Sequence, residues 1–485
     1  MIKPVFLATD IALFALLAAF VWYSVYVRRT PPLAAQWARV FQPRTGMACG
    51  VVLAAFISLS LLDSLHYRTP LPLNAGVQGV QGAQGQQVQA YSPKTTSVLE
   101  AIIKHMQAGQ EKTYSRPLHT TQLVKETALI NGVSVRDNPP LTFGGAHLRP
   151  EGVRGELADS VVWLDVVKRA ISGAVLGLGV AAALVSVWLA ALLAGAGLGL
   201  KDTRRFLAQA QLPWTTGFAT LAVLCVVAGA LWHISLGWHV LGTDRAGNDM
   251  LYLALKSVRT ALAIGFITVL ASLPFALVLG IAAGTLRGWV DTLIQYIYTV
   301  LSSIPGILLI AACVLMIQSY IDKNPAAYAT ALERADVKLF LLCMVLGLTS
   351  WAGLARLLRA EAMRLREMDF VLAARSFGVP MWQIMLRHIA PNTMHLLILT
   401  VSMEFSALVL YEAVLSYIGI GVDPAIQSFG GMINGARTEL ARNPIIWWPL
   451  LSAFAFMLAL VLAANLFADC VRDAFDPKTS VGEQP

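Results

Sequence analysis

The sequence predicts an all-α protein that crosses a membrane many times. Of its 485 residues, 57% are hydrophobic and 13% are charged, and the mean hydropathy is +0.65. Soluble domains usually carry about 25% charged residues, so this composition excludes an ordinary soluble enzyme. The apolar residues also gather in long runs, and a helix needs about 20 of them in succession to cross a bilayer. We therefore expect a polytopic protein embedded in the lipid bilayer.

Nine apolar runs are long enough to span a membrane. They lie near residues 5–27, 46–63, 172–199, 214–236, 258–286, 292–318, 338–358, 394–415 and 446–468. The first run is longer than the core of a signal peptide, and Arg28 and Arg29 follow it directly, so we interpret it as a retained anchor. Pro274 and Pro305 lie in the fifth and sixth runs, where each either kinks its helix or is tolerated by packing.

Basic residues in the short loops predict the orientation. Arginines and lysines gather between runs one and two, between three and four, and between seven and eight. A nine-span arrangement places these three loops on one side, and basic loops remain in the cytoplasm. The N-terminus and residues 64–160 are then expected outside, and the C-terminal tail inside. The net charge of +8 reflects this topology, so we expect no nucleic-acid partner.

The chain lacks the common catalytic motifs. No lysine follows a glycine, so there is no phosphate-binding loop of the GxxxxGK[ST] type, and neither HExxH nor GxSxG occurs. We expect no catalytic residue and no cofactor in this chain, and any ATP hydrolysis must take place on another polypeptide. The five cysteines form no CxxC pair and favour packing over disulfides or metal binding; they are Cys49, Cys225, Cys313, Cys343 and Cys470.

Residues 64–160 are expected to form a small domain outside the membrane. They begin with a Gly/Gln run, AGVQGVQGAQGQQVQ, which is typical of a flexible tether. The spacing of apolar residues predicts a helix over Thr96–Met106, capped by Ser97 or a neighbouring threonine, and a possible second helix over Gln122–Ile130. Three histidines share no metal-ligand spacing, so we expect no metal site; they are His105, His119 and His147.

A polar and basic stretch, residues 359–391, separates the seventh and eighth runs. Gly378 follows good helix-forming residues and permits the positive φ that often ends a helix. Val379-Pro380 then begins a second helix, which we expect to stop before Pro391. A narrow apolar stripe at helical spacing is flanked by arginines; it consists of Phe370, Val371, Ala374 and Phe377. The alternative is a solvated loop between two spans.

This stretch resembles the EAA loop of ABC-importer permeases. Ala373, Ala374, Gly378 and Pro391 occupy the matching positions, whereas Leu372 stands where the family usually has glutamate. Ala390 likewise replaces a leucine. The resemblance implies that this loop is a coupling helix that docks into a groove of a cytoplasmic ATPase. It assigns the coupling role to Phe370, Ala373, Ala374, Gly378 and Pro391.

A second motif, residues 239–249, is similar to the HxLGTDxxGRD signature of dipeptide, oligopeptide and nickel importer permeases. The segment reads HVLGTDRAGND, with Asn248 in place of the family arginine. We expect Gly242 to form a turn and Thr243 or Asp244 to cap the helix that follows. Further matches occur in family order: GWVD at 288–291, SIP at 303–305, EAVLSYIGIG at 412–421, SFG at 428–430 with Phe429 in place of tryptophan, and DCVRDAFDP at 469–477.

Together these motifs cover roughly residues 237–478 and imply a type I ABC importer permease core. The organisation that we expect is a two-span extension (1–63), an extracytoplasmic domain (64–160), a third extension span with a linker (161–213) and the permease core (214–485). The implied partners are a second related permease, cytoplasmic ATPase subunits that bind the ATP, and an extracytoplasmic substrate-binding protein. The implied location is the bacterial inner membrane. Alternatives are an ion-coupled secondary transporter, or a membrane sensor or enzyme that acts through residues 64–160.

Two carboxylates stand inside the eighth run. A charge at mid-bilayer costs about 2.5–3.5 kcal/mol on insertion scales, so such a group usually faces protein or water. Glu404 and Glu412 are separated by roughly 80° around a helix, and one broad face can hold both. One interpretation places them on a translocation path, where Glu404 meets a cationic part of the substrate. The alternatives are a protonated Glu404 bonded to a neighbouring helix and a structural hydrogen bond from Glu412 to the following Gly-rich turn.

Overall fold

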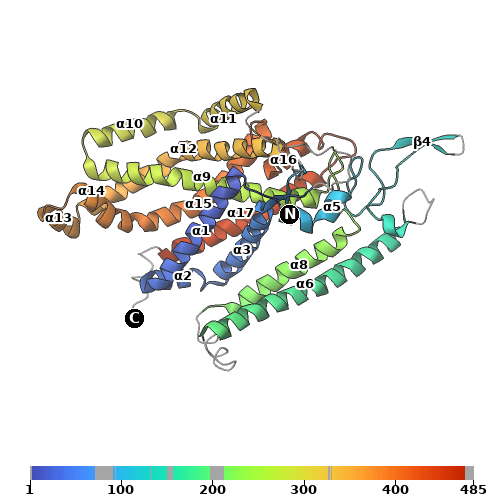
Figure 1. Ribbon diagram of the computed structural model, residues 1–485, viewed down its shortest axis with the longest axis horizontal. Helices are drawn as coiled ribbons and strands as arrows, with labels where there is room; N and C mark the ends of the chain where they lie inside the picture. Colours follow the sequence, from blue (N-terminus) through green and yellow to red (C-terminus); the bar gives the residue numbers. More distant parts are fainter. Residues whose placement is uncertain are drawn as a thin grey trace, which may run out of the picture. The chain divides into compact units, whose positions relative to one another are not determined.

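The computed structural model describes residues 3–70, 91–92, 94–130, 133–149, 157–196, 212–325, 328 and 330–475. Helices dominate this part of the chain (Figure 1). Nine of the described helices are long and apolar enough to cross a membrane, which confirms the expected all-α polytopic architecture. They are α1 (Ala8–Arg29), α3 (Arg44–Ser64), α6 (Asp159–Ala196), α8 (Trp214–Ser235), α9 (Met250–Leu286), α11 (Gly306–Lys323), α12 (Ala331–Arg366), α15 (Ala390–Ile418) and α17 (Trp448–Phe475). The Gly/Gln run expected to be a tether lies outside the described residues.

The chain divides into two compact units. The first unit comprises Met1–Val5, Phe41–Arg259 and Gln427–Ala463, and the second comprises Phe6–Val40, Thr260–Ile426 and Ala464–Pro485. The boundaries fall inside α9 and α17, so each of these two helices contributes to both units. The division into four parts at residues 63, 160 and 213 stays a prediction.

A closely packed pair of helices, α6 and α8, forms one part of the first unit (Figure 1). A side chain at Gly177 would overlap the backbone of Cys225, and one at Gly173 would overlap that of Gly229. Glycine at these positions lets the two helix backbones approach each other, as small residues do in membrane helix pairs. Large apolar side chains such as Ile171 are exposed on the other faces of α6, as a helix surrounded by lipid requires.

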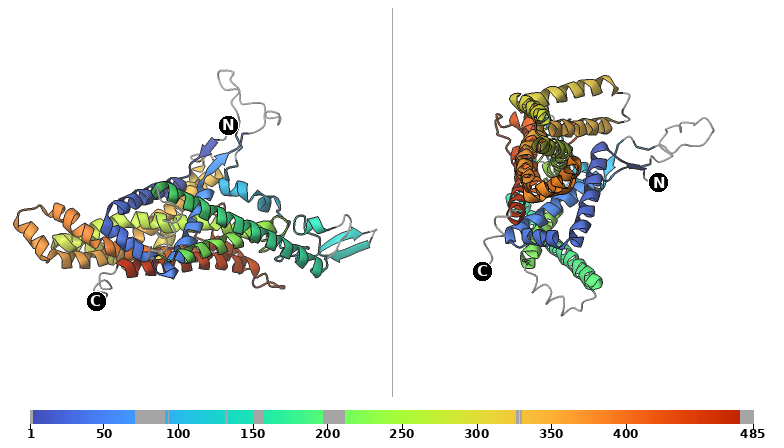
Figure 2. Two further views of the ribbon diagram at one scale, coloured as in Figure 1. Left: turned by 90° about the horizontal axis from the view of Figure 1, so that it is seen from below. Right: turned by 90° about the vertical axis from the view of Figure 1, so that its left-hand side faces the viewer.

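The segment between α3 and α6 contains short strands. β1 (Lys3–Val5), β2 (His66–Arg68) and β3 (Thr96–Ser97) form an antiparallel sheet in that order, and β4 (Glu126–Ile130) pairs with β5 (Val133–Asp137) as a hairpin. The helix predicted over Gln122–Ile130 is therefore wrong. Asn131-Gly132 stands between the two strands in the sequence, and this dipeptide favours a hairpin turn over a helix. The hairpin lies at the end of the unit where α6 begins (Figures 1 and 2).

The helix predicted near Thr96–Met106 is confirmed in two pieces, α4 (Val98–Ile102) and α5 (Lys104–Ala108). Ser97 caps α4: its hydroxyl accepts a hydrogen bond from the Glu100 N–H at 3.0 Å, and the Ser97 N–H donates to the Glu100 carboxylate at 3.4 Å. This reciprocal capping box satisfies two backbone donors that the helix leaves unpaired. Leu99, Ile103 and Met106 pack against Leu251 of α9, so the segment is fixed to the beginning of that helix.

In the second unit, α9, α12 and α15 surround a buried apolar core that includes Ile264, Leu346 and Leu415. α1 packs against α12, and the backbone N–H of Thr9 donates to the carboxylate of Asp336 at 3.0 Å. The Thr9 hydroxyl donates to the same carboxylate. The first apolar run of the sequence is thus joined to the core of this unit. α2 (Pro31–Val40) follows α1.

The sixth predicted span, 292–318, is divided in the structure. α10 (Trp289–Ser303) ends at the SIP motif, and α11 begins directly after Pro305. Ile304 is extended (φ −87°, ψ 132°), because the ring of a proline disfavours helical geometry in the preceding residue. Pro274, in contrast, lies inside the continuous helix α9. Of the two prolines, only Pro305 breaks its helix.

Candidate functional site

The stretch 359–391 forms two short helices at the end of α12. α13 (Asp369–Ser376) follows a break at Glu367–Met368, and α14 (Met381–Ile384) follows the turn at Gly378. Gly378 has φ +76°, as expected, and nothing lies within 4 Å of the position where a Cβ would stand. The backbone conformation, and not crowding, is therefore what requires glycine here.

The second helix does not stop before Pro391, and this expectation is wrong. A π-helical turn (Met385–Ile389) continues α14 into α15, and Pro391 stands in the first turn of α15. The proline ring cannot donate a backbone hydrogen bond, and its place in the first turn removes a donor that would have no partner within the helix. The wider π turn bridges the two helices without ending the chain of helical residues.

One face of the two short helices packs inward. Val371 is 3% exposed and joins Ile384 and Ile389 in a buried cluster with Ile281 of α9 and Leu365 of α12. These contacts fix α13 and α14 against the ends of the two long helices.

The other face carries large apolar side chains that are exposed. Phe377 is 87% exposed, and Trp382 and Leu386 are each 65% exposed. Of the five residues assigned to coupling, Phe370, Ala373, Gly378 and Pro391 are exposed, and Ala374 is partly buried. The predicted stripe is thus split, because Val371 and Ala374 face the core while Phe370 and Phe377 do not. We call Phe370, Phe377, Trp382 and Leu386 the exposed apolar face.

Ion pairs and a hydrogen bond join the base of this stretch to the end of α9 and the beginning of α10. The guanidinium of Arg359 donates two hydrogen bonds to the carboxylate of Asp291, at 2.7 and 2.8 Å. Arg366 donates to the carbonyl oxygen of Thr285 at 2.9 Å, and Arg287 pairs with Glu367 at 2.8 Å. A planar guanidinium that meets a carboxylate with two parallel bonds also fixes the orientation of both groups. The contact between Arg359 and Asp291 could not be predicted from the sequence, because 68 residues separate them and no local pattern indicates that they meet.

The two carboxylates of α15 have different surroundings. Glu412 is 1% exposed, and its carboxylate accepts a hydrogen bond from the Ser416 hydroxyl at 2.7 Å. The same hydroxyl accepts from the Val422 N–H at 3.4 Å, just beyond the turn at Gly419. Glu404 is partly buried, and the ring of its neighbour Phe405 lies so close to Gly265 of α9 that a side chain at Gly265 would overlap it. The structure therefore links Glu412 to the turn and places Glu404 beside a close contact of α9 and α15.

The motif 239–249 forms a compact turn before α9. His239 Nδ1 lies 2.8 Å from the carboxylate of Asp249, so the two ends of the motif meet. Asp249 caps α9, because its other oxygen accepts hydrogen bonds from the N–H groups of Leu251 and Tyr252 at 2.8 and 3.3 Å. The cap expected from Thr243 or Asp244 is therefore wrong. Gly242 has φ +74° and forms the expected turn.

The segment 111–118 is hydrogen bonded to this motif along its backbone. The Glu111 N–H donates to the Gly247 carbonyl at 3.0 Å, and the Leu118 N–H donates to the His239 carbonyl at 3.0 Å. Between them, the Thr243 N–H donates to the Ser115 carbonyl at 3.2 Å. A side chain at Gly247 would overlap the Glu111 backbone, so glycine is required for this approach. We call this region, residues 111–118 with 237–249, the junction.

A buried carboxylate and a buried histidine form the centre of the junction. Glu111 is 4% exposed and accepts hydrogen bonds from the N–H groups of Thr142 and Phe143 at 2.9 and 2.8 Å. Its carboxylate also lies 3.6 Å from His239 Nε2, which is an ion-pair contact rather than a hydrogen bond. His239 is 1% exposed and therefore stands between two carboxylates, those of Glu111 and Asp249.

These contacts determine the charges at the junction. Burial alone disfavours the imidazolium, but the hydrogen bond and charge of Asp249 and the charge of Glu111 raise the pKa of His239 to about 9. Burial likewise disfavours the ionised Glu111, but His239 and the hydrogen bonds from Thr142 and Phe143 lower its pKa to about 2. At neutral pH the junction is thus a buried cation between anions. Sequence reasoning missed Glu111, which no motif includes.

The three histidines considered as metal ligands, His105, His119 and His147, have structural contacts. His105 Nε2 lies 2.8 Å from the Ser235 hydroxyl, and His147 Nε2 lies 2.9 Å from the carboxylate of Asp165. His119 Nδ1 accepts a hydrogen bond from the Thr120 N–H at 3.0 Å. Among the residues that the structure describes, no group of three or more His, Cys, Asp or Glu side chains could hold a metal ion.

Comparison with known proteins gives a match over the C-terminal part of the chain. Residues 276–481 match the family model described as "Binding-protein-dependent transport system inner membrane component". A putative peptide permease protein of Brucella ovis is 37% identical over 98 residues, which cover 20% of this chain and 32% of the relative. The oligopeptide transport system permease protein OppC of Haemophilus influenzae is 32% identical over 96 residues, covering 20% of this chain and 30% of the relative.

The glutathione transport system permease protein GsiD of Escherichia coli is 36% identical over 96 residues, covering 20% of this chain and 30% of the relative. The chain thus spans about a third of the length of the curated relatives that it matches. Among solved structures, a chain of the MetNI methionine ABC transporter in inward-facing conformations is 17% identical, with a TM-score of 0.35, covering 46% of this chain and 97% of that chain.

Proposed function

We propose that the chain is a permease subunit of an ATP-driven importer, because residues 276–481 match the model of the family described as "Binding-protein-dependent transport system inner membrane component". The protein is a multi-pass protein of the inner membrane. Together with a second, related permease it forms a path for peptides or similar small solutes. The support for this substrate class is that similar proteins are named as peptide, oligopeptide and glutathione permeases.

The proposed link to ATP hydrolysis is the exposed apolar face of the 359–391 stretch. Phe377, Trp382 and Leu386 are more than half exposed, and they lie between Arg375 and Arg387 in the sequence. Large apolar side chains that are exposed between two spans favour a binding site for another protein. We assign to this face the docking of a cytoplasmic ATPase subunit, which supplies the ATP site. This exposed face is the single observation that carries the coupling proposal.

Replacement of Phe377 by serine tests the docking. Burial of a phenylalanine side chain contributes about 1.5–3 kcal/mol, so its loss is expected to weaken ATPase binding by roughly ten-fold or more. The measurement is the amount of ATPase subunit that co-purifies with the tagged permease. Arg364→Ser, a polar change at an exposed position of the same stretch, is the matched control and leaves recovery unchanged. Equal recovery with Phe377→Ser and with the control would remove the exposed face from the docking surface.

Glu404 and Glu412 are proposed to belong to the translocation path, in different ways. Glu412 supports the turn at Gly419 through Ser416, and this turn then shapes the end of the path. For Glu404, the structure gives no hydrogen bond or ion pair within its described part, and the role proposed for its carboxylate is contact with a cationic part of the substrate. Glu404→Gln keeps the side chain's size and removes the charge. We expect this variant to take up peptides with a free amino terminus more slowly than wild type does, and acetylated peptides at the wild-type rate. Wild-type uptake of both kinds of peptide would exclude this role.

Residues 64–160 are proposed to lie outside the cytoplasm, without enzymatic activity of their own. The support is the orientation that the basic loops indicate. A reporter enzyme that works only outside the cytoplasm is expected to be active when fused near Gly109 and inactive near Gly378. The opposite pattern would invert the topology.

A further inference from the structure

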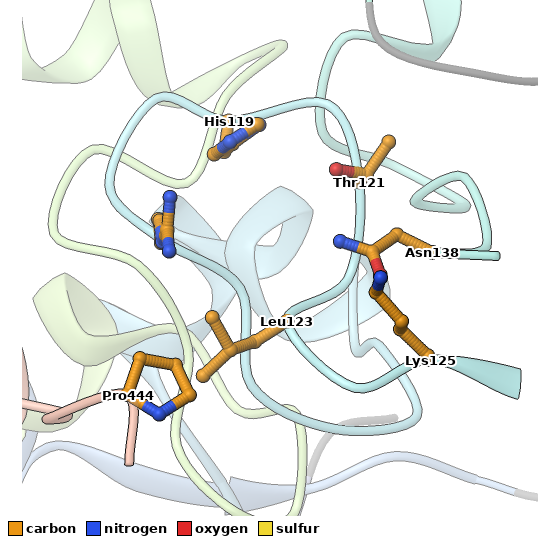
Figure 3. Close-up of a pocket in the computed structure, with 7 residues that line it drawn as sticks. His119, Thr121, Leu123, Lys125, Asn138 and Pro444 are labelled. Carbon is orange, nitrogen blue, oxygen red and sulfur yellow. The ribbon is translucent and has the colours of Figure 1, made fainter.

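A cavity of about 210 Å³ lies within the first unit. It is lined by Arg116, His119, Thr121, Leu123, Lys125, Asn138 and Pro444. Six of these residues come from the segment between α3 and α6, and Pro444 comes from the segment between α16 (Phe429–Arg437) and α17. In Figure 3, polar side chains from His119, Thr121 and Asn138 lie on one side of the cavity, and Leu123 and Pro444 lie on the other.

The charge of the lining is positive. Arg116 and Lys125 contribute two cations, and none of the lining residues in the described part of the chain is acidic. Of the acidic residues nearby in the sequence, Glu126 pairs with Lys112 at 3.7 Å, and Asp137 accepts a hydrogen bond from the Asn138 N–H at 2.8 Å. No ion pair within the described residues neutralises Arg116 or Lys125. Two cations that converge on one cavity attract an anionic group, and an arginine suits a carboxylate in particular.

The cavity also presents one acceptor that lacks a donor. The Oδ1 atom of Asn138 is buried and has no hydrogen-bond partner among the described residues. A buried acceptor without a partner costs about 1–3 kcal/mol, and a ligand N–H would offset this cost. His119 Nδ1 accepts from the Thr120 N–H, so the proton of the neutral ring stands on Nε2.

The remaining wall is apolar and the space is small. Leu123 and Pro444 offer an apolar surface opposite the polar side chains. A volume of 210 Å³ equals that of roughly seven water molecules, which is enough for the last residue of a peptide but not for the surface of a folded protein. The cavity thus combines a site for an anion, an acceptor for an N–H group and an apolar wall.

We propose that this cavity binds the carboxyl terminus of a short peptide. The terminal carboxylate pairs with Arg116 and Lys125, the N–H of the last residue donates to Asn138 Oδ1, and an apolar side chain lies against Leu123 and Pro444. The inference rests on the proposed import of peptides and adds to it a binding site formed mainly by the segment between α3 and α6. A bare inorganic anion satisfies the two cations but neither the Asn138 acceptor nor the apolar wall.

The test is peptide binding to the full-length chain in lipid nanodiscs, without ATP or partner subunits. The probe is the tripeptide Ala-Ala-Leu with a fluorophore on its amino terminus, compared with the same peptide amidated at its carboxyl terminus. We expect saturable binding of the free acid and at least ten-fold weaker binding of the amide. Arg116→Ala with Lys125→Ala lowers the affinity for the acid by at least ten-fold. Arg136→Ala, an exposed arginine on β5 that does not line the cavity, leaves it unchanged.

Several outcomes would overturn the proposal. Equal affinity for the acid and the amide excludes recognition of the carboxylate. Wild-type affinity of the Arg116→Ala, Lys125→Ala double variant for the acid, with a wild-type elution profile, excludes a role of the two cations in binding. Displacement of the peptide by millimolar inorganic phosphate would show a general anion site instead. Arg116→Lys, which keeps the charge, is expected to retain part of the affinity and separates a loss of charge from a loss of fold.

A parallel assay distinguishes this proposal from the transport function. ATP-driven uptake by the assembled importer, together with absent peptide binding by the isolated chain, would overturn only the cavity. Carboxylate-dependent binding without ATP-driven uptake would overturn only the proposed transport.

Discussion

The 359–391 stretch and the junction differ in where they place side chains that are costly for a folded protein: the first exposes apolar groups, and the second buries charged groups. In the 359–391 stretch, large apolar side chains such as Phe377 remain exposed on the outer face of two short helices. At the junction, the charged Glu111 and His239 are buried and find their partners within the chain. Exposed apolar groups indicate a surface for another protein, whereas buried ion pairs indicate a contact that is complete. The first region is therefore expected to tolerate substitution without loss of fold, and the second is not.

The largest effect on stability is expected from His239→Ala. Removal of one partner from a buried ion pair leaves the other charges uncompensated and costs about 3–5 kcal/mol. We expect the first unit to be less stable, so that a protease cleaves segment 94–130 rapidly. Limited proteolysis of the chain in nanodiscs measures this rate of cleavage. His119→Ala is the control, because His119 is only partly buried and lies outside the Glu111–Asp249 contact. Equal protease resistance in the two variants would contradict the role of the junction.

Gly378→Val is expected to stop transport with a smaller cost in stability. A residue with a branched side chain resists φ +76°, at a cost of about 1–2 kcal/mol, so the turn between α13 and α14 must change. We expect normal membrane insertion, but loss of ATP-coupled uptake or of the ATPase subunits. Gly353→Val is the control, because Gly353 also has open space around it but lies within α12 at negative φ. Wild-type uptake by Gly378→Val would remove the coupling role of this turn.

The smallest effect is a dependence of stability on pH. The pKa of His239 is raised from 6.5 to about 9, so its contribution is complete below pH 6.5 and is lost as the pH rises through 9. The pKa of Glu111 is lowered from 4.5 to about 2, so its contribution is complete above pH 4.5 and is lost as the pH falls through 2. We expect protease resistance of the first unit to be greatest between pH 4.5 and 6.5 and to decline towards pH 10. A His239→Gln variant with the same decline would show that other groups cause it.

The same comparison explains how much could be predicted from the sequence. Gly378 and the Ser97 cap were predictable because each is a local signal whose partner lies within a few residues. Glu111 was not, because its partner His239 lies 128 residues away and no motif contains it. The end of the helix at Pro391 was misplaced because a π turn absorbs the missing donor, which spacing alone does not reveal. The split of the apolar stripe at Val371 likewise depends on α9 and α12, which the local pattern does not include.

The most direct test of the central proposal is peptide uptake by the complete importer in lipid vesicles. The vesicles contain this chain with its second permease and ATPase subunits, and the binding protein is supplied on the opposite side from ATP. The account predicts uptake of a labelled peptide that requires ATP hydrolysis, persists when ionophores remove all ion gradients, and is lost in the Phe377→Ser variant. Uptake that proceeds without ATP and follows an imposed ion gradient would contradict it and would identify an ion-coupled transporter instead.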